Sequence, residues 1–367
     1  MALTGAMSAA ITGLKAHMDA LNVVGNNVAN VNTYGYKAGR VTFRESIYST
    51  QSAGAAGTTA TGGTNPRQIG YGTSVGTIDL DMATSSLEAT GFGLDVAIQG
   101  DGFFLVGPKN AGGTDGITSM EAVKSLSFTK VGDFRFDADG YLTDGAGNVV
   151  YGFMSAATLD GDPGINENPV FSTDLVPIRL PMKSTAAGSE GDAVYVGVET
   201  NTGANINPDD PGAATIDDVD GCVTLENISI DENGVISGTN KDTGDPVVVG
   251  CLALGTVANP NGLLHTDGPY YTAAEAAGDA RVFAPNSRVT GNLRNDHILN
   301  ADGDPSADSA LAANSEVGLM PGFLEASGTD LATEFSNMII YQRGYQANTR
   351  IITVTDSMLE ELVNIKR

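Results

Sequence analysis

The chain has 367 residues, a formal net charge of −25 and 41% hydrophobic residues. The length fits roughly two or three domains, and the hydrophobic content is enough to build real cores, which excludes a disordered protein. The excess of acidic residues argues against nucleic-acid binding, because phosphate contacts require clustered Lys and Arg. With 47 glycines and only 17% charged residues, the composition predicts many turns and short strands.

The first predicted element is a helix over about residues 3–30. Apolar side chains recur at alternating spacings of four and three residues, which places them on one face of a helix. Frequent alanines add helix propensity, and the Gly- and Asn-rich segment 25–33 ends the helix. The apolar row consists of Met7, Ile11, Leu14, Met18 and Leu21.

The next segment changes composition. Residues 49–64 are Ser, Thr, Ala and Gly with one Gln and no large apolar side chain. Such a composition is typical of a flexible linker or an extended loop.

Short strands are predicted after this segment. Residues 94–98 alternate between apolar and polar side chains, residues 99–102 form a turn, and a strand resumes at 103–106. The clearest pattern lies within residues 128–153, where strands at 134–136, 141–143 and 149–153 are separated by Asp- and Gly-rich turns. These three strands predict an antiparallel meander.

Asp, Pro and Gly become dense between residues 155 and 220. Strands are predicted at 194–198, 223–230 and 235–236, and residues 246–254 lead back toward the first β region. This arrangement predicts a second β domain that is inserted into the first.

The last predicted element is a helix over about residues 330–364, roughly 50 Å long. Thr329 or Asp330 could cap its start. Its row again alternates spacings of four and three residues, but Gln342, Thr349 and Asp356 interrupt it, so the helix needs neighbours. Both helices flank the β-rich region, which favours a separate helical domain over one compact globular domain.

Motifs for chemistry are weak. His17, His265 and His297 are too far apart in sequence to indicate a metal site. Segments 137–140 and 300–304 resemble halves of calcium loops, but Asp and Gly are also ordinary turn residues. No nucleophile, phosphate-loop or dinucleotide motif occurs. The sequence therefore predicts no enzyme activity, no cofactor and no metal.

Cys222 and Cys251 are too far apart for a CxxC site. Two small buried side chains are the simpler interpretation, and a disulfide stays open because sequence does not give their separation. No run of 18 apolar residues occurs, so no membrane span is expected. The N-terminal segment lacks a basic n-region and a continuous apolar h-region, so any export is expected to proceed without a standard cleaved signal peptide.

Two stretches near opposite ends of the sequence carry a family resemblance. Residues 23–37 resemble the N-terminal signature of flagellar axial proteins, the rod, hook and hook-associated subunits. Residues 337–350 and 356–364 resemble the matching C-terminal signature. Between them, residues 95–104 are similar to a segment of rod and hook proteins, and residues 259–263 resemble the hook branch where the chain returns from an inserted domain.

The resemblance implies a mainly β fold with α-helical termini: two β domains, the outer inserted in the inner, and a terminal two-helix coiled-coil domain. We expect the helical domain at 1–32 and 330–367, a linker or extended segment at 33–70, the inner β domain at 71–153 and 251–329, and the outer β domain at 154–250. The helices would line an inner tube. The expected subunit-interface residues are Met7, Ile11, Leu14, Met18, Leu21, Leu331, Phe335, Met338, Tyr345, Ile352, Leu359 and Val363.

The function implied by the resemblance is that of a structural subunit in the extracellular flagellum, which self-assembles into a helical tubular polymer. The inserted domain favours the hook branch, a curved flexible tube that couples rod to filament and transmits torque. Expected partners are further copies of the chain, the flagellar rod, hook cap and hook–filament junction proteins, and the flagellar export apparatus. The distal rod branch is the alternative within the family, and a secreted adhesin or β-rich binding module is the alternative outside it.

Overall fold

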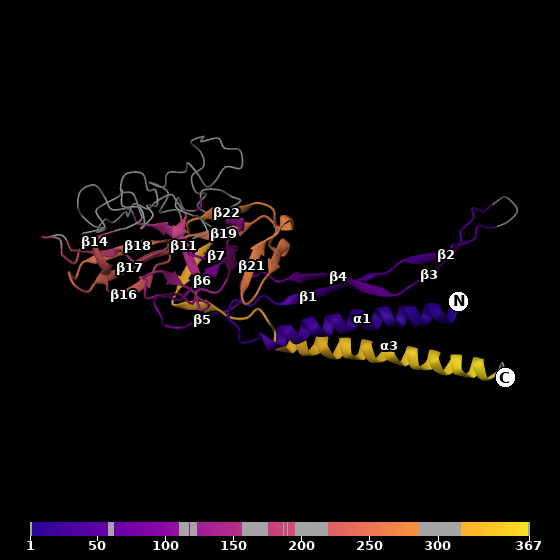
Figure 1. Cartoon of the computed structure of the whole chain (residues 1–367). Coiled ribbons are helices and arrows are strands. Elements are labelled where there is room, and N and C mark those ends of the chain that lie inside the picture. Colours follow the sequence, from indigo (N-terminus) through magenta and orange to yellow (C-terminus); the bar gives the residue numbers. More distant parts are fainter. Residues whose placement is uncertain are drawn as a thin grey trace. The chain divides into compact units, whose positions relative to one another are not determined.

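A computed structural model describes residues 2–57, 62–109, 117, 123–155, 175–185, 187–188, 190–194, 219–285 and 317–365. Figure 1 traces the chain, which divides into two compact units. Unit 1 comprises Met1–Asp81 and Ser327–Arg367, and unit 2 comprises Met82–Ala326. The finer division of the β region into an inner domain and an outer domain at 154–250 stays a prediction.

Two long helices form one part of unit 1. They are α1 (Ala2–Ala29) and α3 (Leu331–Ile365), and they lie side by side in opposite directions (Figure 1). Both predicted helices are confirmed. Asp330 caps α3, because its carboxylate accepts hydrogen bonds from the Ala332 N–H at 3.0 Å and the Thr333 hydroxyl at 2.6 Å.

A β ribbon completes unit 1. Strand β1 (Gly39–Glu45) pairs antiparallel with β4 (Thr73–Leu80), and β2 (Tyr48–Ser52) pairs antiparallel with β3 (Arg67–Gly70). Strands β1 and β4 contact α1. The sequence predicts a linker or extended segment in this part of the chain. It does not predict the ribbon, because local composition carries no information on which strands pair with each other.

The largest sheet of unit 2 is antiparallel wherever its pairs are described. Its main path runs through β16 (Leu225–Ile230), β17 (Val235–Asn240), β18 (Pro246–Leu252), β11 (Val149–Met154), β7 (Phe103–Gly107), β8 (Ser127–Thr129), β21 (Tyr270–Ala273) and β20 (Leu263–His265). Branching from this path are β9 (Arg135–Phe136), β10 (Leu142–Thr143), β12 (Val176–Pro177), β19 (Leu254–Val257) and β22 (Ala280–Phe283). The chain order β9, β10, β11 confirms the predicted meander.

The remaining described elements of unit 2 are short strands and 3-10 helices outside this sheet. They are β5 (Leu87–Ala89) paired with β24 (Phe323–Glu325), β6 (Val96–Gln99) paired with β23 (Gly318–Pro321), the sheet of β14 (Ala193–Val194), β13 (Met182–Ser184) and β15 (Val219–Cys222), and the 3-10 helices η2 (Pro260–Gly262) and η3 (Glu275–Ala277). The strands predicted at 94–98 and 103–106 correspond to β6 and β7, which pair with other strands rather than with each other. Of the strand predicted at 194–198, residues 195–198 lie outside the described part.

Three aspartates shape turns of unit 2 in the same way. Asp137, Asp144 and Asp231 each accept, through Oδ1, hydrogen bonds from the backbone N–H groups two and four residues later, at 2.7–3.0 Å. Each turn also contains a glycine with a positive φ, which costs no steric strain without a side chain. The Asp-Gly motif that resembled half a calcium loop at 137–140 is therefore a structural turn, and segment 300–304 lies outside the described residues.

The core of unit 2 is apolar and aromatic. Phe104 on β7 is fully buried, and its ring meets that of Phe134 edge to face at a centroid distance of 5.0 Å. Side chains from β11 and β18 join the same cluster, as does Ile236 on β17. Strands β16–β18, from the predicted outer domain, thus continue the sheet formed by β7 and β11 of the predicted inner domain.

Candidate assembly surface

The face of α1 that is buried within unit 1 consists mainly of small residues. Its buried positions include Ala10, Gly13, Ala16 and Ala20. A methyl group on Gly13 would lie 2.8 Å from Nδ2 of Asn348 on α3, so the two helices approach too closely for a side chain here. At this position the two helices therefore meet at a glycine and not at a large side chain.

His17 fills a second close approach between the helices. Its ring lies against Gly344, where an added methyl group would be 2.6 Å from the imidazole. The ring centroid is 5.4 Å from that of Phe43 on β1 and 6.2 Å from that of Tyr341 on α3. Nδ1 is buried without a hydrogen-bond partner, and burial lowers the pKa of His17. The neutral ring therefore packs as an aromatic side chain.

Asn27 links three segments at the end of α1. Its side-chain nitrogen donates to the Gly39 carbonyl at 2.8 Å and to Oε1 of Glu334 at 3.2 Å. Its side-chain oxygen accepts from the Gly39 N–H and the Tyr36 hydroxyl, both at 3.0 Å. One amide thus joins α1, the chain leading into β1 and the first turn of α3.

Glu334 is the acidic member of this group. It is buried, and its Oε2 has no hydrogen-bond partner. Burial raises the pKa of Glu334, and the hydrogen bond from Asn27 lowers it by a smaller amount. Loss of Asn27 would leave this carboxyl without its described donor.

The structure leaves the sequence-predicted interface residues exposed or half-buried. Ile11, Met18, Leu331, Phe335, Leu359 and Val363 are exposed, with between 38% and 69% of each accessible. The other six are half-buried, namely Met7, Leu14, Leu21, Met338, Tyr345 and Ile352. None of the twelve is fully buried, and their role as a subunit interface stays a prediction.

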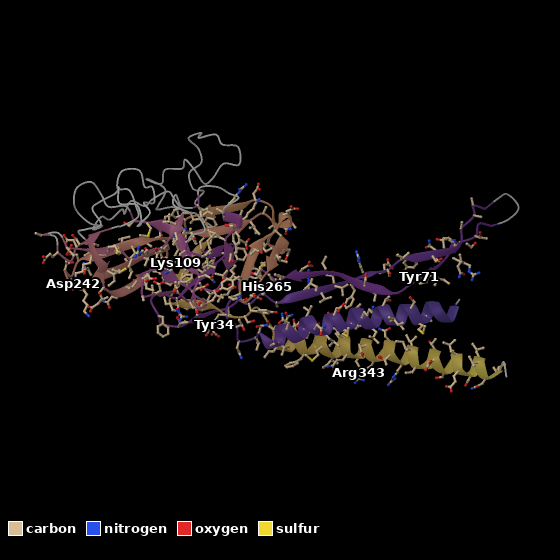
Figure 2. The ribbon with its side chains drawn as sticks, in the orientation of Figure 1. Tyr34, Tyr71, Lys109, Asp242, His265 and Arg343 are labelled. Atoms are coloured by element: carbon tan, nitrogen blue, oxygen red, sulfur yellow. The ribbon has the colours of Figure 1, made fainter. Side chains whose placement is uncertain are left out.

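A further apolar row on α3 was missed from the sequence. It contains Ile340, Ile351, Val354, Met358, Leu362 and Ile365, and between 45% and 80% of each side chain is exposed. The spacings from 351 onward are three, four, four and three residues, which is a helical pattern in its own right. Helix α3 carries two such rows, and the sequence analysis predicts only the longer one as an interface. Side chains line the outer side of α3 along its length, and Arg343 lies away from α1 (Figure 2).

The β ribbon is also apolar at its surface. Ile47, Tyr48, Ile69, Tyr71 and Ile78 are all at least 41% exposed. The ribbon contacts α1 near its start, where the Thr12 hydroxyl donates to the Tyr71 carbonyl at 3.2 Å. Unit 1 therefore presents large exposed apolar side chains on both helices and on the ribbon, more than an isolated soluble unit usually does.

The described residues offer little basis for chemistry. They contain no group of three or more metal-ligating side chains. Lys109 Nζ lies 3.2 Å from Asp137 and 2.8 Å from Asp139, so an ammonium group neutralises this acidic turn. Cys222 and Cys251 are free thiols, and burial raises the pKa of Cys251. Among the helices of the described chain, none combines the length and apolar character that a membrane span requires.

These features define a class of protein, a structural subunit whose helical unit is built to pack against other molecules. Comparison with known proteins gives the family. Residues 7–37 match the family described as flagella basal body rod protein, and residues 320–365 match flagellar basal body rod FlgEFG protein C-terminal.

Full-length relatives agree with these matches. The flagellar basal-body rod protein FlgG of Bacillus subtilis is 30% identical, over 97% of this chain and 97% of the relative. The flagellar hook proteins FlgE of Borreliella burgdorferi and Salmonella typhimurium are 25% and 26% identical, over 97–98% of this chain and 98–99% of each relative. The chain belongs to the flagellar rod and hook protein family and is a structural component of the bacterial flagellum.

Proposed function

We propose that this chain is the structural subunit of the flagellar hook. The carrying observation is the exposed apolar surface of α1 and α3, which an isolated subunit leaves in water and a polymer would bury. Hook proteins from several bacteria match nearly the whole chain, which supports the hook over other parts of the flagellum.

In this proposal many copies join through unit 1 into a helical tube. The interface rows on α1 and α3 pack against neighbouring copies and line the inner wall. The net charge of −25 opposes random association, so specific apolar contacts must supply the attraction. The β domains lie outside the helical wall, with residues 154–250 outermost, and they tilt against one another as the tube bends and transmits torque from rod to filament.

The proposed partners follow from this position. They are the flagellar rod, the hook cap, the hook–filament junction proteins and the export apparatus that delivers the subunit. The proposal assigns no catalytic role to the chain.

A distal rod subunit is the second candidate. The observation in its favour is the FlgG relative, which matches the chain at 30% identity over 97% of its length. Electron microscopy of the purified polymer separates the two candidates. A hook subunit is expected to form curved tubes, whereas a rod subunit is expected to form straight ones.

The role of the predicted inner-tube row is tested by Leu359→Asp. Leu359 is exposed within unit 1, so the variant is expected to fold but to lose polymerisation, because a charge would be buried at the subunit contact. Gln346→Asp, at another exposed position of α3, is the matched control and should polymerise. Sedimentation measures polymer yield, and near-ultraviolet circular dichroism checks the β region. Normal polymers from the Leu359 variant would exclude this row as an interface.

A further inference from the structure

The acidic charge of the chain belongs to one of its two units. Unit 1 contains nine acidic and nine basic residues, so its formal charge is zero. Unit 2 contains the remaining 35 acidic and 10 basic residues and therefore carries the whole formal charge of −25. The unit with the exposed apolar helices is electrically balanced, whereas the unit joined to it repels every other copy of itself.

Most basic side chains of unit 2 are already engaged inside that unit. Lys130 is buried and donates to the Gly100 carbonyl at 2.9 Å. Arg179 lies 5.0 Å from the ring centroid of Tyr141 and donates to the Asp139 carbonyl at 3.2 Å. Four more form salt bridges with acidic residues of the same unit, namely Lys109, Arg135, Lys183 and Lys241. Salt bridges between copies of unit 2 therefore have few basic groups to draw on, and the acidic excess needs another source of positive charge.

Packing through unit 1 would crowd the copies of unit 2. The axes of two packed helices lie about 8–10 Å apart. A compact unit the size of residues 82–326 is about 45 Å across, much wider than this spacing. Copies that meet through their helices therefore bring the surfaces of unit 2 within a Debye length of one another, which is about 10 Å at 0.1 M ionic strength.

We propose that mobile cations control assembly by screening the charge of unit 2. At low ionic strength the repulsion between copies of unit 2 opposes the apolar contacts of unit 1, and at higher ionic strength those contacts prevail. The cations act diffusely, and the described residues contain no group of three or more metal-ligating side chains. The inference rests on the proposed polymer and specifies how its formation is regulated.

The critical concentration for polymerisation of the full-length chain tests this dependence. It is expected to fall at least about tenfold as NaCl rises from about 20 to about 200 mM. Sodium sulfate at equal ionic strength should act alike, because screening depends on ionic strength, whereas salting out of apolar surface favours sulfate. A critical concentration that stays constant, rises with salt or follows the anion would refute this inference and leave the hook proposal intact. Absence of polymer at every ionic strength would instead overturn the proposed function and this inference with it.

A graded charge series tests whether the effect comes from unit 2. Four exposed acidic residues of unit 2 lie outside the described salt bridges, namely Asp101, Glu232, Asp245 and Asp267. One variant combines Asp101→Asn, Glu232→Gln, Asp245→Asn and Asp267→Asn, and a second combines Asp101→Lys, Glu232→Lys, Asp245→Lys and Asp267→Lys. Starting from −25, the four changes bring unit 2 to about −21 in the first variant and about −17 in the second.

Repulsion between like units scales with the square of their charge. The change in the logarithm of the critical concentration with salt should therefore fall to about 70% of its original size in the amide variant and to about half in the lysine variant. The matched control combines Asp101→Glu, Glu232→Asp, Asp245→Glu and Asp267→Glu, which keeps the charge, and it should behave like the original chain. A lysine variant with the original salt dependence would exclude unit 2 as its source.

Discussion

Removal of the Asn27 side chain should weaken unit 1 far more than removal of its neighbour Asn26. Asn27→Ala deletes four hydrogen bonds to Gly39, Tyr36 and Glu334. It leaves the buried Glu334 carboxyl without its described donor and leaves the Gly39 N–H to find another acceptor. Each buried polar group that loses its partner costs about 1–3 kcal/mol, so the expected total is about 3 kcal/mol.

Asn26→Ala is a close control. The Asn26 side chain is exposed, and its nitrogen donates to the Tyr36 hydroxyl at 3.2 Å while its oxygen accepts from Asn30 at 3.0 Å. Water can replace these bonds, so the expected cost is below about 1 kcal/mol. Both variants replace asparagine by alanine in α1, so the gain in helix propensity is similar in the two.

The assay is urea unfolding followed by circular dichroism at 222 nm. The two long described helices belong to unit 1, so this signal follows that unit. With a slope of about 2 kcal/mol per molar urea, a loss of about 3 kcal/mol lowers the midpoint by about 1.5 M. Equal midpoints for the Asn27 and Asn26 variants would refute the idea that one buried amide holds α1, β1 and α3 together.

Two further predictions concern the seam between the helices. Because the folded pKa of His17 lies below its ordinary value, the unfolded chain takes up this proton first, and stability is lost as pH falls below about 6.5. His17→Phe keeps an aromatic ring that cannot be protonated. The urea midpoint of this variant minus that of the original chain should therefore increase from pH 7 to pH 5. A constant difference would exclude protonation of His17 as the cause of the stability loss. Gly344→Ala should destabilise unit 1 by about 1–3 kcal/mol because the added methyl group overlaps His17, whereas Gly25→Ala, with no atom within 4 Å, should stabilise it by up to about 1 kcal/mol in the same unfolding assay.

The helices were predictable because their apolar spacing is regular over many turns. Their mutual packing was not, since Ala10, Gly13, Ala16 and Ala20 form the buried face of α1 and carry almost no hydrophobic signal. The large side chains of the predicted rows are instead exposed or half-buried. The close approaches of α1 and α3 occur at Gly13 and Gly344, which a pattern of large side chains does not predict.

The β region shows a similar limit. The meander within 128–153 was predictable because its strands are consecutive and its turns contain Asp and Gly. The pairing of β6 with β23 joins Val96 to Pro321, and no local pattern could indicate a partner so distant in sequence. The role of Asn27 was equally unpredictable, because an asparagine near the end of a helix indicates only that the helix ends there and does not indicate its hydrogen-bond partners.

Unit 1 is assembled from two segments that flank one continuous stretch, residues 82–326. The order of synthesis therefore decides which unit can be completed first. Unit 2 has all of its residues before α3 exists, whereas α1 must wait for residues 327 onward before it can find its intramolecular partner. A chain interrupted after residue 326 would hold every residue of unit 2 and yet have no α3 for Asn27 or the small face of α1 to meet. Only a molecule synthesised through α3 can present both helices for assembly, so completion of unit 1 reports that synthesis has passed both segments that build it.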